Sequence, residues 1–243
     1  MTQFLVASGL ERDTVLLDGE EARHLSCVHR VQPGERVRLF DGAGRVADGV
    51  VIRATRSAVE LSVHNRREYS RIFPEIVVRP ALIKQDRFEL LLEKCTELGA
   101  DRFAPVVTAR SSMSAGTFRT RVERFRRILL ETAKQCNRTH LAVLGDPVAL
   151  ADTLQSCGSG VVRVAAVLVP GAGSVIPVLH DAGASGSPGS SIELFVGPEG
   201  DYTDEETAML RAAGVRCVTL GSAILRAETA AMFLTGLAAL HRS

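Results

Sequence analysis

The sequence predicts an α/β protein with two domains, and three features of the chain support this prediction. Over residues 37–63 apolar and polar residues alternate around the turn residues Asp41-Gly42, a pattern typical of a small β-barrel. The later part of the chain instead alternates short apolar runs with helical patterns, which favours a mainly parallel sheet. Because the polar segment 64–75 separates the two patterns, we expect a β-barrel domain over residues 1–72 and an α/β domain over residues 73–243.

Each element follows from its local pattern. Residues 20–29 have the pattern of a short helix that precedes the strands of the barrel. Apolar residues spaced three and four apart from Phe88 to Leu98 predict a helix that ends at Gly99. The other predicted elements are strands over 76–83, 103–108, 141–145 and 161–169 and helices over 119–135 and 148–155. The segment 171–191 is rich in Gly, Ser, Ala and Pro, so we expect a flexible surface connection.

Composition and charge limit the class of protein. The 243 residues carry a net charge of +1 and 46% are hydrophobic, as in ordinary globular proteins. The chain shows no signal-peptide pattern and no apolar run of about 18 residues, so we expect a cytoplasmic protein that does not cross a membrane. The five cysteines are scattered, and His24 and His29 are too far apart to share a face of an α-helix. We therefore expect thiols in a reducing compartment and no metal site.

Positive charge is concentrated between Arg110 and Arg138, within and around the helix predicted over 119–135. Basic side chains outnumber acidic ones in residues 1–140, whereas acidic side chains outnumber basic ones in residues 141–243. A basic concentration of this kind is typical of a surface that binds a phosphate backbone, and it is equally found on a solvated helix face.

Two glycine-bearing loops near the C-terminus carry the chemistry that the sequence suggests. Each follows an apolar strand-like run and precedes a helix, the first at Gly197–Gly200 and the second at Leu220–Ala230. Because ligands of α/β proteins bind at the carboxyl ends of strands, we expect both loops to line one pocket. Thr203 and Glu206 have the spacing of a capping box for the helix that follows the first loop. Taken singly, each loop also fits a plain strand-to-helix turn.

Taken together, the two loops resemble those of the SPOUT-type RNA methyltransferases of the RsmE family, which methylate N3 of a uridine in 16S ribosomal RNA. The motifs are GPEG at residues 197–200 and LGSAILRAETA at residues 220–230. The similarity extends over most of the chain, including His29-Arg30, Asp86-Arg87 and Arg110-Ser111. It implies a PUA-like N-terminal barrel that binds RNA and a SPOUT α/β domain whose last segment threads a deep trefoil knot, one of the rare exceptions to unknotted topology.

The resemblance also implies a cofactor and an assembly. The knotted loops of the family hold S-adenosyl-L-methionine (SAM), and its members are typically homodimers. The terminal helix, with a face of small residues that includes Ala231 and Gly236, is the candidate for part of the dimer contact. The residues implied to bind the cofactor are Leu168, Val169, Leu194, Phe195, Val196, Gly197, Pro198, Gly200, Leu220, Gly221, Ile224 and Leu225.

Catalytic and RNA-binding roles are implied in the same way. Arg226 is the candidate for stabilising negative charge on the uracil oxygens. Glu199 or Glu228 accepts the N3 proton or orients Arg226, and Glu228 also fits a carboxylate at a helix N-terminus. The RNA, expected as 16S ribosomal RNA or the small ribosomal subunit, is gripped by Arg30, Arg87, Arg110, Arg119, Arg124, Arg127 and Arg138.

The chain departs from the family pattern at four positions. Asp201 stands where the family usually has a second glycine, and Ala223 and Ala227 stand where it often has arginine and threonine. Lys134 stands where it commonly has glutamate. Because Glu199, Arg226 and Glu228 are all present, we expect activity. Two alternatives stay open: a SPOUT enzyme that methylates another position, such as a ribose 2′-hydroxyl or tRNA, and a non-catalytic RNA-binding factor in ribosome assembly.

Overall fold

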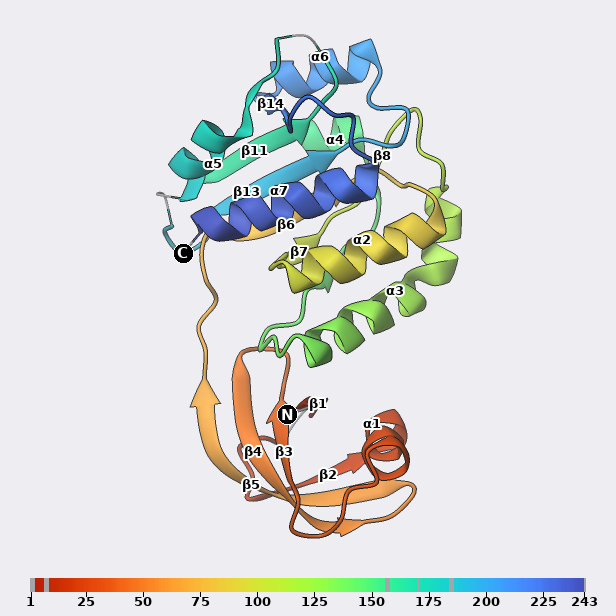
Figure 1. The fold of residues 1–243 in the computed structure, drawn as a ribbon, viewed down its shortest axis with the longest axis vertical. Helices are drawn as coiled ribbons and strands as arrows, with labels where there is room; N and C mark the ends of the chain where they lie inside the picture. The colour runs from red at the N-terminus through yellow and green to blue at the C-terminus, as the bar shows by residue number, and fades with distance from the viewer. Residues whose placement is uncertain (1–2, 7–8, 156–157, 170, 184–185, 243) are drawn as a thin grey trace. The chain divides into compact units, whose positions relative to one another are not determined.

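The computed structural model describes residues 3–6, 9–155, 158–169, 171–183 and 186–242 (Figure 1), and Cys157 lies outside these residues. The chain forms two compact units, Met1–Arg71 with Glu131–Leu141 and Ile72–Leu130 with Ala142–Ser243. Residues 131–141 therefore belong with the first unit although they follow part of the second in the sequence. None of the helices in the described ranges has the length and apolarity needed to cross a membrane.

The first unit is a curled sheet of five strands in the order β1-β3-β4-β5-β2, so that β1 and β2 form its two edges (Figure 1). Its elements are β1 (Gln3–Leu5), β2 (Thr14–Asp18), α1 (Gly19–Arg23), the π-helix η1 (His24–Val28), β3 (Arg36–Phe40), β4 (Arg45–Ala54) and β5 (Ala58–Glu68). Alternate residues of β5, Val59 and Leu61, point into its core and are fully buried, as expected for a half-buried strand. The polar residues up to Glu68 continue β5, although the sequence predicted that the strand pattern ends at Val63. The prediction missed them because these residues are exposed and therefore lack the alternation of apolar and polar residues that marks a strand.

His24, the first residue of η1, and His29, which directly follows η1, correct a second prediction. In a π-helix the backbone bonds join residues five apart, and His29 N donates to the carbonyl oxygen of His24 at 3.1 Å. The two rings therefore share a face and lie edge to face with 5.0 Å between their centroids. The prediction that they lie on different faces assumed an α-helix and is wrong.

Lys134 shows how this chain accommodates one departure from the family pattern. Its side chain is buried in the first unit, at 3% exposure. The Nζ atom donates to Glu21 at 2.8 Å and to Glu131 at 3.2 Å, and it lies 5.8 Å from the centre of the Phe4 ring. A buried ammonium needs such partners because desolvation of an uncompensated charge is unfavourable. The basic residue at this position is thus balanced by acidic neighbours of its own unit.

The second unit is built on a parallel sheet of seven strands in the order β12-β14-β11-β13-β6-β7-β9 (Figure 1). Its strands are β6 (Glu75–Pro80), β7 (Arg102–Phe103), β9 (Val143–Leu144), β11 (Val161–Ala166), β12 (Gly173–Ser174), β13 (Ser191–Val196) and β14 (Arg216–Thr219). A separate parallel pair joins β8 (Val106–Val107) to β10 (Val148–Ala149). The helices are α2 (Gln85–Glu97), α3 (Ala115–Gln135), α4 (Leu150–Leu154), α5 (Val175–Gly183), α6 (Asp204–Ala212) and α7 (Ala227–His241).

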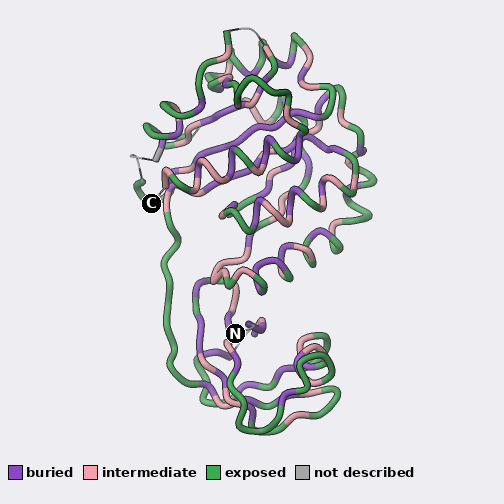
Figure 2. The backbone as a smooth tube through the Cα atoms, in the orientation of Figure 1, coloured by how far each residue is buried: buried purple, intermediate pink, exposed green. Residues whose placement is uncertain are grey.

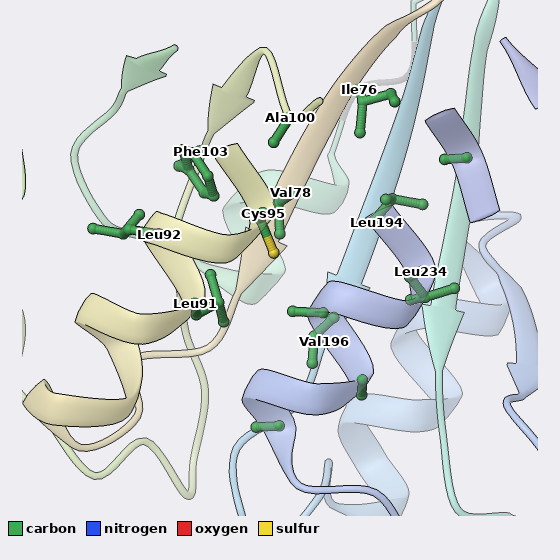
Figure 3. Close-up of a cluster of buried hydrophobic side chains, with 14 of the residues drawn as sticks. Ile76, Val78, Leu91, Leu92, Cys95, Ala100, Phe103, Leu194, Val196 and Leu234 are labelled. Carbon is green, nitrogen blue, oxygen red and sulfur yellow. The ribbon is translucent and has the colours of Figure 1, made fainter. Parts of the chain in front are cut away.

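Helices cover both faces of this sheet, so its central strands are the most buried part of the unit (Figure 2). On one face, Ile192 and Leu194 of β13 join a core with α2, α3, α5 and α7. Figure 3 shows this core, with Leu91 of α2, Leu194 of β13 and Leu234 of α7 among its side chains. On the other face, Phe195 packs in a smaller core with Leu150 of α4 and residues of α6. Burial on both faces explains why β13 is buried continuously from Ile192 to Val196, with the one charged residue, Glu193, paired with Arg79 and Arg163.

Three predictions for this unit need correction. The segment expected as a flexible connection contains β12 and α5, because Val175, Leu179 and Ala182 form an apolar stripe that is buried in the main core. The single strand predicted over 103–108 is split into β7 and β8, which pair in different sheets on either side of Pro105. The helix predicted from Arg119 begins at Ala115. The trefoil knot implied by the resemblance remains a prediction.

Candidate functional site

A pocket of about 370 Å³ lies where β11, β13 and β14 end. We call residues 197–203 the β13 loop and residues 220–226 the β14 loop, and both contribute to the pocket as the sequence predicted. The lining residues are Arg87, Ala166, Val167, Leu168, Val196, Gly197, Pro198, Glu199, Asp201, Thr219, Leu220, Gly221, Ala223, Ile224, Leu225, Arg226, Ala227 and Ala230. This position agrees with the rule that ligands bind at the carboxyl ends of parallel strands.

The β13 loop ends in the predicted capping box. Thr203 Oγ1 accepts from the backbone N–H of Glu206 at 3.2 Å, and Glu206 Oε2 accepts from the backbone N–H of Thr203 at 3.0 Å. The other carboxylate oxygen of Glu206 accepts from Ala109 N at 2.7 Å. The buried Glu206 therefore ties the start of α6 to the segment that follows β8.

The same segment fixes the middle of the β13 loop. Ser112 Oγ donates to Glu199 Oε2 at 2.9 Å, and the Arg110 guanidinium donates to the carbonyl oxygen of Gly200. Glu199 thus lines the pocket with one carboxylate oxygen held by a neighbouring hydroxyl. Arg110, which the resemblance implies as an RNA contact, lies against the outer side of this loop.

The β14 loop is more open. Gly221 has a φ of +130°, a conformation that favours glycine, and Ile224 is 79% exposed. A hydrogen bond of 3.0 Å from Thr219 Oγ1 to the carbonyl oxygen of Gly221 closes the turn. The loop ends at Arg226, whose exposed side chain lines the pocket and whose carbonyl accepts the first helical bond of α7 from Ala230 at 2.8 Å.

Arg87 and Glu228 form an ion pair at the edge of the pocket, with 3.3 Å between Nη1 and Oε1. Arg87 lines the pocket, whereas Glu228 is buried in the first turn of α7 outside the lining. Glu228 Oε2 has no hydrogen-bond partner among the described residues. The carboxylate of Glu228 thus contacts a guanidinium that lines the pocket. The resemblance implied an RNA contact for Arg87, and the sequence gave no sign that it would meet Glu228.

The structure brings together most of the residues implied to bind the cofactor. Eight of them line the pocket: Leu168, Val196, Gly197, Pro198, Leu220, Gly221, Ile224 and Leu225. Leu194 and Phe195 lie instead in the two cores, Val169 packs against the smaller core, and Gly200 contacts Arg110. Ala230, the last residue of the second predicted loop, also lines the pocket, whereas sequence reasoning did not single out Ala166, Val167 and Thr219. These three lie at the strand ends before the predicted loops, so counting the adjoining strand ends would have found them.

The other arginines implied to bind RNA differ in how they are held. Arg119 and Arg127 are exposed on α3, and Arg30 is exposed in the first unit. Arg138 is half-buried in the first unit. Arg124 makes two hydrogen bonds to the Glu89 carboxylate, at 2.6 and 2.7 Å, and these bonds lower the pKa of Glu89. No group of three or more His, Cys, Asp or Glu side chains in the described ranges could hold a metal ion.

Comparison with known families defines the class of protein. Residues 71–239 match the family described as RNA methyltransferase domain, and residues 17–63 match the RNA methyltransferase PUA domain. The predicted architecture of a PUA-like domain followed by a SPOUT-type α/β domain is therefore confirmed.

Individual relatives narrow the class to one family. Ribosomal RNA small subunit methyltransferase E of Mycobacterium bovis is 33% identical over 91% of this chain and 84% of the relative. The protein of the same name from Synechocystis is 30% identical over 89% of this chain and 70% of the relative. The crystal structure of this enzyme from Neisseria gonorrhoeae, bound to S-adenosyl methionine, superposes with a TM-score of 0.85 at 26% identity, covering 97% of this chain and 95% of the other. The chain belongs to the ribosomal RNA small subunit methyltransferase E family.

Proposed function

We propose that the protein transfers a methyl group from SAM to N3 of a uridine in 16S ribosomal RNA. The observation that carries this proposal is the pocket at the ends of β11, β13 and β14, which brings the GPEG loop and Arg226 together. The relatives named above act on small-subunit ribosomal RNA, and one of them binds S-adenosyl methionine in the same fold. Such a substrate places the activity in the cytoplasm, where bacterial ribosomal subunits are assembled.

The residues of the pocket fit SAM. The volume of the pocket, about 370 Å³, lies within the range of ~300–1,000 Å³ usual for small-ligand sites. Leu168, Leu220 and Leu225 offer apolar surface for an adenine ring. Gly197 and Gly221 let the backbone approach a ligand closely. When bound, SAM supplies a methyl carbon that its positively charged sulfur makes electrophilic.

The protein must align the uracil with that methyl carbon and help N3 lose its proton, because the neutral imide is a poor nucleophile. We assign to Glu199 the role of accepting the N3 proton, because Glu199 lines the pocket and is oriented by Ser112. Glu228, by contrast, lies outside the lining. Arg226 stabilises the negative charge that develops on the uracil oxygens. Glu228 serves by positioning Arg87 at the edge of the same pocket.

Binding of the RNA follows from the exposed arginines of both units and from the accessibility of the base. N3 is hidden when a uridine is paired, so the enzyme must meet an unpaired or flipped nucleotide. The exposed guanidinium groups of Arg30 and Arg119 can contact phosphates of the RNA. Because such contacts release counterions, the affinity for RNA should fall as the salt concentration rises.

We also propose that the active form is a homodimer, with a contact different from the one the sequence suggested. The small residues of α7 are used inside the unit, since Ala231 and Ala238 are fully buried and Gly236 packs near Leu98, the residue that follows α2. Phe233 and Leu240 on the same helix are exposed, at 46% and 75%, and are the apolar groups that a second copy would cover.

Nucleoside analysis of ribosomal RNA tests the reaction. In a strain that lacks this protein, mass spectrometry should show the loss of 3-methyluridine from 16S ribosomal RNA, and a plasmid copy should restore it. Persistence of 3-methyluridine, with loss of a ribose-methylated nucleoside or of a tRNA modification, would assign the enzyme to another RNA position. Titration calorimetry with SAM separates both from a non-catalytic assembly factor, which would bind no cofactor.

A further inference from the structure

Asp201 occupies a backbone conformation that is unusual for its residue type. Its φ is +56°, in the left-handed region that non-glycine residues rarely adopt, although aspartate tolerates it better than most. The residue directly follows the GPEG motif and closes a turn in which its N–H donates to the carbonyl oxygen of Pro198 at 2.9 Å. A glycine would take this conformation with less strain, so the aspartate side chain must contribute something that offsets it.

The Asp201 carboxylate makes a hydrogen bond between two walls of the pocket. Its Oδ2 atom accepts from the backbone N–H of Leu168 at 2.8 Å, and both residues line the pocket. Leu168 belongs to residues 167–169, which follow β11 and which we call the β11 wall of the pocket, whereas Asp201 belongs to the β13 loop. On its other side the β11 wall is joined to β14, because Val167 N donates to the carbonyl oxygen of Val218 at 3.1 Å. The side chain of Asp201 therefore completes a chain of contacts through all three walls.

The neighbouring glycine makes room for this carboxylate. A Cβ atom at Gly197 would lie 3.1 Å from Asp201 Oδ1 and 3.2 Å from a ring carbon of Tyr202, closer than ordinary van der Waals contact. Tyr202 is buried and packs in the smaller core, so it cannot move aside easily. The side chain of Asp201 thus has a defined place, bounded by Gly197 beneath it and by Leu168 across the pocket.

We propose that Asp201 is a positioning residue that fastens the β11 wall to the β13 loop and so holds the cofactor pocket open in its binding shape. This inference rests on the proposed function, because it assigns SAM to the pocket. A charge-assisted hydrogen bond is stronger than a neutral one. A wall that is ordered beforehand spares the ligand the entropy of ordering it. Asp201, which stands where the family usually has glycine, then orders the pocket and does not impair its function.

Two substitutions at this position separate the hydrogen bond from the charge. Asp201→Gly relieves the backbone strain and removes the acceptor, whereas Asp201→Asn keeps an acceptor oxygen for Leu168 N and removes the charge. By calorimetry, we expect Asp201→Gly to weaken SAM binding about tenfold, the equivalent of one charge-assisted hydrogen bond, and Asp201→Asn to stay within about threefold of wild type, since a neutral hydrogen bond persists. The thermal midpoint of Asp201→Gly without cofactor should stay close to wild type, because relief of the backbone strain offsets the lost hydrogen bond.

Amide hydrogen exchange gives a readout that needs no cofactor. The Leu168 N–H should be protected in wild type and in Asp201→Asn and should exchange faster in Asp201→Gly. Equal protection in all three proteins, or equal SAM affinity of wild type and Asp201→Gly, would overturn the proposal. An Asp201→Asn variant as weak as Asp201→Gly would overturn it too, because charge rather than the bond would then matter. If wild type itself fails to bind SAM, the proposed function fails, and the exchange data still decide whether the contact orders the wall.

Discussion

The β13 loop and the β14 loop look alike in the sequence, but the structure holds them very differently. Side chains from two other segments fix the β13 loop: Ser112 and Arg110 after β8 contact Glu199 and Gly200, and Glu206 of α6 caps the turn at Thr203. The β14 loop is exposed from Gly221 to Ile224 and carries a local hydrogen bond of 3.0 Å from Thr219 Oγ1 to the Gly221 carbonyl oxygen.

The difference suggests that the two loops divide the work of the pocket. A loop fixed by many contacts is suited to bind the cofactor, because its shape is set before the ligand arrives. The β14 loop also offers Leu220 and Leu225 to the cofactor, but it is exposed and ends at Arg226, so it is the loop suited to meet the RNA, whose base must enter from solvent. The following substitutions test this division, from the largest expected effect to the smallest.

Arg226→Ala should have the largest effect on turnover. Loss of the guanidinium removes stabilisation of charge in the transition state, so we expect turnover to fall by about 10²–10³-fold. The dissociation constant of SAM should stay close to the wild-type value. Single-turnover methylation and calorimetry measure the two quantities. Arg211→Ala, which removes an exposed arginine of α6 outside the lining, is the control. If SAM affinity fell as far as turnover, the division between the loops would be wrong.

Gly197→Ala should have the reverse effect, with SAM affinity as the main loss. The added methyl group would lie within 3.3 Å of Asp201 Oδ1 and of the Tyr202 ring, and overpacking of this kind destabilises by about 1–3 kcal/mol. We expect binding to weaken by about tenfold or more for a disturbance of that size. Gly173→Ala is the control, since Gly173 lies outside the pocket lining, has no positive φ, and has nothing within 4 Å of its added methyl group. It should leave SAM binding close to wild type, and an equal loss there would contradict the role given to Gly197.

Thr203→Ala tests whether the capping box holds the β13 loop. Removal of an N-cap hydroxyl typically lowers stability by ~1 kcal/mol, and we expect that change in the free energy of unfolding measured with urea. Because the loop adjoins the pocket, SAM binding should weaken as well. Ser222→Ala in the exposed β14 loop is the control and should leave unfolding unchanged. Equal stability of Thr203→Ala and wild type would contradict a fixed β13 loop.

The contrast between an exposed arginine and one paired with a carboxylate predicts a small difference in RNA binding. Arg119→Ala removes an exposed cation, so the slope of log affinity against log salt should fall by about one unit. Arg124→Ala should change the slope less, because Glu89 already neutralises that guanidinium through two hydrogen bonds. Filter binding of small-subunit RNA at several salt concentrations measures both. Identical slopes for the two variants would show that the pairing with Glu89 does not survive contact with RNA.

Local signals in the sequence predicted the parts of the fold that depend on local physics. The alternation in β5 and the capping box at Thr203 appear as expected, and the stripe predicted from Phe88 to Leu98 is buried as far as Cys95 whereas Leu98 is exposed. Errors occurred where a local rule was too simple. The π-helix at His24 was treated as an α-helix, and the short stripe of α5 was hidden by its glycine-rich surroundings.

The site was predictable to the extent that it follows the chain. The strand–glycine–helix pattern located the β13 and β14 loops and Arg226. It could not show which distant side chains reach them. Ser112 meets Glu199 and Arg87 meets Glu228 only because the sheet brings segments far apart in sequence to one edge. The bond between Asp201 and Leu168 has the same origin.

The central claim is that this pocket transfers a methyl group from SAM to N3 of a uridine in small-subunit ribosomal RNA. Its most direct test is to incubate the purified protein with isotopically labelled SAM and small ribosomal subunits from the deletion strain, and then to identify the labelled nucleoside by mass spectrometry. The account predicts labelled 3-methyluridine at one position of 16S ribosomal RNA, and labelling slower by about 10²–10³-fold with Arg226→Ala. Label in a ribose-methylated nucleoside, or no transfer by a wild-type protein that binds SAM, would contradict it.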